Sequence, residues 1–140
     1  MEISDLLRHR IIKSRMAQRT EKADEAATDL WAQMAVQIIS IVGEDGFNSL
    51  YARSVFLTQS AFPWLVAGLV SAQNDRQFLE LKTSLEGQTP AEASAANSLL
   101  LITFTDILAA LIGEQLTTNV LRSAWDIDAA GSLGEELINV

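Results

Sequence analysis

Two segments of the chain repeat the same order of residues. Residues 38–55 and residues 108–124 each run from an apolar stretch through a Gly-Glu pair to an Arg-Ser pair. The offset is 70 residues at the glycine, Gly43 against Gly113, and one residue less at the arginine. A repeat of this kind is typical of related structural units packed against each other. The sequence therefore predicts two helical halves around an approximate two-fold axis.

The composition favours a single folded domain made of α-helices. Apolar residues make up 49% of the 140 residues and charged residues 20%, which is the balance of a globular chain. The chain has only two prolines, and no useful length alternates apolar and polar residues as a strand does. We therefore predict one all-α domain, a helical bundle of five to seven helices with an internal two-fold pseudo-repeat.

Helix start and stop signals divide this predicted bundle. Thr89, Pro90 and Glu92 form a capping box that opens a helix, whereas Gly43 and Gly113 are placed to end helices. The helix after Thr89 becomes apolar almost all round, which predicts a central position. The single domain 1–140 is accordingly divided into a basic N-terminal helix 1–22, a first half 24–72, a connecting helix 74–86, a second half 90–125 and an acidic tail 126–140.

Charge is unevenly distributed along the chain. The formal net charge is −8, yet residues 1–22 carry +3 and the remainder carries −11. Because phosphate binding depends on summed positive charge, the acidic body argues against a nucleic-acid partner.

Four cations of the N-terminal segment share one face at helical spacing, namely Arg8, Arg15, Arg19 and Lys22. We predict that this basic face contacts an acidic protein partner. The alternatives are a solvated face, a contact with the acidic surface of this same chain, and binding to nucleic acid or anionic lipid. Trp64 follows a helix break at Pro63 and is the aromatic residue assigned to the same partner-binding role, with a core position as the alternative.

The charged residues of the repeat give the most specific polar signal. We predict that Glu44 and Glu114 form structural ion pairs with Arg53 and Arg122 across the pseudo-axis. Anion binding by the two arginines is the alternative. Asp106 lies within the apolar helix, and it either faces water or pairs with one of these arginines.

The sequence offers few groups for catalysis or metal binding. It has no cysteine, which excludes disulfides, thiolate metal sites and thiol nucleophiles. Its single histidine, His9, lies in the basic segment. We predict no enzyme activity, no metal site and no cofactor, and keep a phosphotransfer module based on His9 as an alternative.

These patterns favour a non-enzymatic regulatory or protein–protein interaction module in the cytoplasm. Residues 99–112 are apolar on more faces than one bundle readily covers, so we expect self-association as a homodimer. The alternative is a ligand-sensing helical domain with an apolar pocket between the two halves. The first residues lack the apolar run of a signal peptide, and the run 99–113 is shorter than the roughly 20 residues that a membrane span needs. No membrane span is therefore expected.

Overall fold

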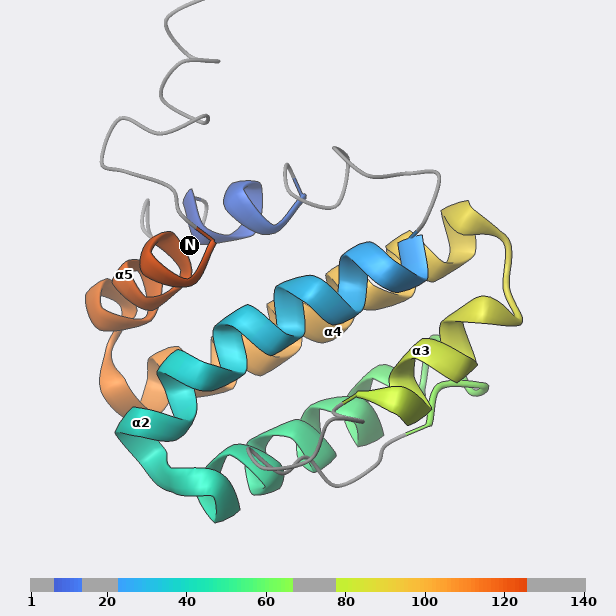
Figure 1. Cartoon of the computed structure of the whole chain (residues 1–140). Helices are drawn as coiled ribbons and strands as arrows, with labels where there is room; N and C mark the ends of the chain where they lie inside the picture. The colour runs from blue at the N-terminus through green and yellow to red at the C-terminus, as the bar shows by residue number, and fades with distance from the viewer. Residues whose placement is uncertain (1–6, 14–22, 67–77, 126–140) are drawn as a thin grey trace, which may run out of the picture.

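The regular structure of the chain is helical throughout the part that the computed structural model describes, residues 7–13, 23–66 and 78–125. These residues contain five helical segments and no strand, which confirms the all-α prediction. A short helical stretch at residues 7–13 comes first. The other four are α2 (Ala23–Thr58), α3 (Leu79–Glu86), α4 (Pro90–Ile112) and α5 (Glu114–Ala124), shown in Figure 1. Thr89 caps the start of α4 as predicted, since its Oγ1 accepts a hydrogen bond from the Glu92 amide at 3.2 Å, which is one of the two bonds of a capping box.

Two glycines set the directions of the longest helices. Gly43 has φ 83° and ψ 165° and bends α2 into a first arm, residues 23–42, and a second arm, residues 44–58. Gly113 has φ 97° and ψ 152° and separates α4 from α5. This backbone region is essentially restricted to glycine. A Cβ at either position would meet no atom within 4 Å, so the backbone conformation, not the available space, requires glycine.

Helix α2 packs against α3, α4 and α5, most extensively against α4. In Figure 1 the first arm of α2 and α4 run side by side in the same direction, so both glycine bends lie at the same end of the molecule. The second arm of α2 and α3 lie on one side of this pair, and α5 and residues 7–13 lie on the other (Figure 1).

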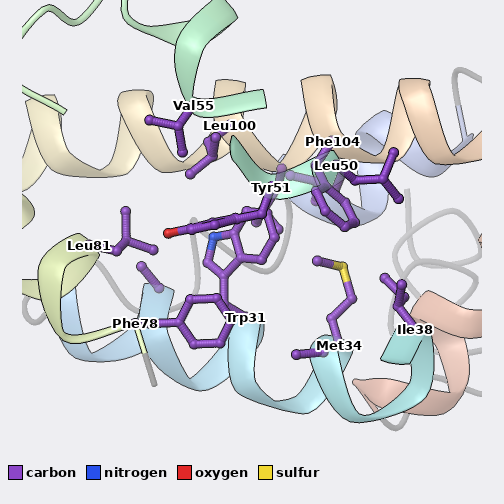
Figure 2. Close-up of a cluster of buried hydrophobic side chains, with 14 of the residues drawn as sticks. Trp31, Met34, Ile38, Leu50, Tyr51, Val55, Phe78, Leu81, Leu100 and Phe104 are labelled. Atoms are coloured by element: carbon purple, nitrogen blue, oxygen red, sulfur yellow. The ribbon is translucent and has the colours of Figure 1, made fainter. Parts of the chain in front are cut away.

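A cluster of aromatic side chains forms the centre of the core (Figure 2). The Trp31 ring meets Phe104 edge-on at 5.1 Å and Tyr51 edge-on at 5.2 Å between ring centroids. Edge-to-face pairs at this separation add to the stabilisation from burial alone. Trp31 Nε1 donates a hydrogen bond to Asn97 Oδ1 at 2.7 Å, which compensates the only polar atom of the buried indole.

Nine pairs of buried positions lie 70 residues apart in the described chain, although the partners of some other buried residues, such as Leu100 and Ser54, are only partly buried. In the first arm of α2 and in α4 the buried pairs are Ala27 and Asn97, Trp31 and Leu101, Met34 and Phe104, Ala35 and Thr105, and Ile38 and Leu108. After the glycines the pairs are Phe47 and Thr117, Leu50 and Val120, Tyr51 and Leu121, and Val55 and Trp125. At this offset Arg122 is paired with Ala52, whereas the Arg-Ser pairs of the sequence pair it with Arg53.

The central helix α4 begins well before the apolar run of residues 99–113, which by itself is shorter than a membrane span. It has 23 residues and is, by length and composition alone, apolar enough to cross a membrane. Of the most apolar 18-residue stretch of this helix, 39% is buried inside the protein. The helix also carries Asn97, bonded to Trp31, and Asp106, bonded to Arg8.

Candidate functional site

A buried arginine joins the two ends of the described chain. The Arg8 side chain is 2% exposed, and its guanidinium contacts Glu114 through two nitrogens, Nε to Oε2 at 2.7 Å and Nη2 to Oε1 at 3.0 Å. Arg8 Nη1 donates to Asp106 Oδ1 at 2.6 Å and to Thr105 Oγ1 at 2.9 Å. Such a two-nitrogen contact with a carboxylate is the strongest geometry available to an ion pair. The cluster therefore fastens residues 7–13 to α4 and α5.

The electrostatics of the cluster keep Arg8 charged. Burial alone lowers the pKa of Arg8, but the hydrogen bonds from Glu114 and Asp106 and the charges of these carboxylates outweigh it and raise that pKa above its ordinary value. The Arg8 guanidinium consequently remains protonated and positively charged at any accessible pH. The arrangement can hold helices together, but Arg8 cannot act in it as an acid or a base.

His9 borders the same cluster. Its Nε2 lies 3.0 Å from Asp106 Oδ1, and the side chain is partly buried. A phosphodonor approaching this nitrogen has to displace a carboxylate that is also bonded to Arg8. The phosphotransfer alternative therefore gains no support from the geometry.

The predicted ion pairs of the repeat are only partly placed as expected. Glu114 does form a buried ion pair, but its partner is Arg8 and not Arg122. Within the described residues no ion pair is recorded for Arg53, which is exposed, or for Arg122, which is half-buried. Glu44 is exposed. The physical reason is that residues 7–13 pack onto α4 and α5 and bring a guanidinium to Glu114 from outside the repeat motif.

One of the four cations that were predicted to form the basic face is buried. Arg8 points into the protein and is closed to a partner, whereas Arg15, Arg19 and Lys22 lie outside the described residues. Trp64 is half-buried and meets Phe62 edge-on at 5.8 Å between ring centroids. Asp106 is 49% exposed and pairs with Arg8 and His9, so neither Arg53 nor Arg122 is its partner.

Sequence reasoning missed the pairing of Arg8 with Glu114. The two residues are 106 positions apart, and the helical spacing of Arg8 with other cations indicated a solvent-facing residue. The available signal was Asp106, an acid inside an apolar helix, which needs a cation or water nearby. That signal did not identify which cation was the partner.

A groove lies between residues 7–13 and α5. It has a volume of about 210 Å³ and is lined by Leu7, Gln115, Thr118, Asn119 and Arg122. Four of these five side chains are polar, and the groove does not lie between the two predicted halves 24–72 and 90–125.

Exposed apolar side chains gather near the glycine bends. Ile41 is 43% exposed and Leu111 is 66% exposed, each two residues before its glycine, and Leu116 in the first turn of α5 is 43% exposed. We call these three residues the elbow surface. The other large apolar residues with high exposure are Val36, Phe56, Leu57, Val66 and Leu79, of which Phe56 is the most exposed at 71%.

Comparison with known proteins adds no relative of this chain. No protein-family model, no curated protein and no solved structure matches it. Among the described residues, no group of three or more histidine or acidic side chains is arranged to hold a metal ion.

Proposed function

We propose that this protein is a non-enzymatic regulatory interaction module that associates with a second copy of itself through the elbow surface. The observation that carries the proposal is the exposure of Ile41, Leu111 and Leu116, which lie within three residues of the two glycine bends. Single exposed apolar residues are common on soluble proteins, whereas a group of them is characteristic of a contact surface.

The proposal includes two related halves. Its support is the 70-residue offset between the nine pairs of buried positions and the shared backbone conformation of Gly43 and Gly113. The same offset relates residues 7–13 to α3, because Arg8 and Ile11 are buried like Phe78 and Leu81. Each half then consists of a short helix followed by a long helix, a glycine and a further helix.

This symmetry explains why the elbow surface lies where it does. Ile41 and Leu111 are equivalent positions in the two halves, one turn or less before the glycine. Because the first arm of α2 and α4 run in the same direction, equivalent residues of the two halves come to the same end. Exposed apolar residues of both halves therefore lie near the same end, and burying them between two chains would favour association.

The polar groups of the described chain support a structural role over a catalytic one. The best-organised titratable cluster is centred on Arg8, whose raised pKa excludes proton transfer by that residue. Glu114 and Asp106 are both engaged by the same guanidinium.

Charge substitutions on the elbow surface test the proposal. Leu111→Glu and Leu116→Glu place a charge in the proposed contact, so light scattering should report a single chain at concentrations where the native protein associates. Phe56→Glu is the matched control, because Phe56 is more exposed than either residue and lies about 19 Å along the helix from Gly43.

The control should associate like the native chain, and circular dichroism should show native helix content and melting for all three variants. Association that survives Leu111→Glu and Leu116→Glu but is lost in Phe56→Glu would move the contact to the second arm of α2 and refute the elbow surface.

A further inference from the structure

One stripe of α5 presents polar side chains toward residues 7–13. Gln115 and Arg122 each lie three and four residues from Thr118 and Asn119, so the four share one face of α5. All four line the groove with Leu7. Gln115 and Asn119 are exposed and carry amide N–H donors. The groove thus combines one guanidinium with two primary amides.

Arg122 supplies the positive charge of this groove. Its side chain is half-buried, and the structure records no ion pair for it among the described residues. The nearest carboxylate of α5, Glu114, is held by Arg8 through two nitrogens, so its negative charge is already compensated. Arg10 is exposed and follows Leu7 by three residues, which places a second cation on the same side of that helical stretch.

The size of the groove limits what it can hold. Its volume of about 210 Å³ lies below the 300–1,000 Å³ of pockets that enclose a whole drug-sized molecule. It therefore suits a single charged group, whether free or projecting from a larger molecule. Guanidinium and amide N–H groups are donors only, so the group they match is an oxygen-rich anion.

We propose that this groove binds a small oxyanion, a carboxylate or a phosphate group, with Arg122 as the charged contact and the amides of Gln115 and Asn119 as hydrogen-bond donors. The site is distinct from the buried Arg8 cluster, in which the Arg8 side chain is 2% exposed and its guanidinium is bonded to Glu114, Thr105 and Asp106. It is also independent of self-association, because it requires only one chain.

Nuclear magnetic resonance titration of the full chain tests the site. Sodium phosphate, sodium acetate and, as reference, sodium chloride are added at constant ionic strength, and the side-chain signals of Gln115, Asn119 and Arg122 are followed. We expect saturable shifts with phosphate or acetate and none with chloride. A tighter dissociation constant for phosphate assigns a phosphate ligand, and an equal or tighter one for acetate assigns a carboxylate ligand.

Two variants and one control locate the binding. Arg122→Gln removes the charge, and Asn119→Asp adds a carboxylate to the groove at an exposed position that tolerates substitution. Each should weaken the dissociation constant at least about tenfold, equivalent to about 1.4 kcal/mol. Arg53→Gln removes an arginine of the second arm of α2 that, like Arg122, has no ion pair among the described residues, and it should leave the dissociation constant unchanged. The absence of saturable shifts, or an equal loss in Arg53→Gln and Arg122→Gln, would overturn the proposal.

Discussion

Removal of the Arg8 guanidinium should be among the most damaging single changes to the stability of this protein. Arg8→Met keeps an unbranched chain of similar length but leaves the partly buried Glu114, at 18% exposure, without its cation. Among the described residues, Thr118 at 3.4 Å is then its remaining hydrogen-bond donor. Breaking a fully buried ion pair by removing one partner costs about 3–5 kcal/mol. Asp106 is half-exposed and adds only about 0–1 kcal/mol. Because Glu114 retains some contact with water, we expect a loss of about 3 kcal/mol.

Urea unfolding measures this loss directly. With a slope of about 2 kcal/mol per molar urea, the midpoint of Arg8→Met should fall by about 1.5 M. Arg53→Met is the control, because Arg53 is exposed and has no recorded ion pair, and its free energy of unfolding should stay within about 0.5 kcal/mol of the native value.

A double-mutant cycle separates the ion pair from simple loss of packing. The double variant Arg8→Met with Glu114→Gln leaves no stranded carboxylate, so it should be more stable than the sum of the single losses predicts by about 1–3 kcal/mol. Equal midpoints for Arg8→Met and Arg53→Met, or strict additivity in the cycle, would refute the view that the cluster joins residues 7–13 to the bundle.

Two further predictions concern the glycine bends and the buried tyrosine. Gly43→Ala and Gly113→Ala should each lower the free energy of unfolding by about 1–3 kcal/mol, and by similar amounts, because both residues have the same glycine-specific backbone conformation. Gly87 has φ −75°, so Gly87→Ala should be neutral or slightly stabilising in the same urea assay. Tyr51, the only tyrosine, is buried, which together with the charge of Glu80 raises the pKa of its hydroxyl. Its contribution to stability is therefore full below pH about 10 and decreases at higher pH, where the unfolded chain ionises first. Tyrosinate absorbance should therefore appear only together with unfolding. Tyr51→Phe removes a buried hydroxyl with no recorded partner, so it should be neutral or stabilising by up to about 1 kcal/mol. The same variant should weaken the loss of stability at alkaline pH.

Local sequence signals predicted local structure well. The cap at Thr89 forms because its hydrogen bond joins residues three positions apart and needs no tertiary context. Gly113 ends α4, and Gly43 turns α2, because no other residue adopts their backbone conformations without strain.

The candidate site was less predictable because it depends on contacts between distant segments. Periodicity shows which face of a helix is apolar, but it does not show which helix covers that face. Arg8 looked solvent-facing beside other cations, yet the packing of residues 7–13 onto α4 brings it to Glu114 and Asp106. The groove at Arg122 arises from the same packing, since Leu7 forms its opposite wall.

Self-association is the central claim about function, and sedimentation velocity of the unmodified chain tests it most directly. The protein is measured from low to high micromolar concentration at physiological salt. We predict that the weight-average sedimentation coefficient rises with concentration toward that of two chains, and that Leu111→Glu holds it at the value of one chain. A native protein that sediments as a single chain across the whole range would contradict the proposed function.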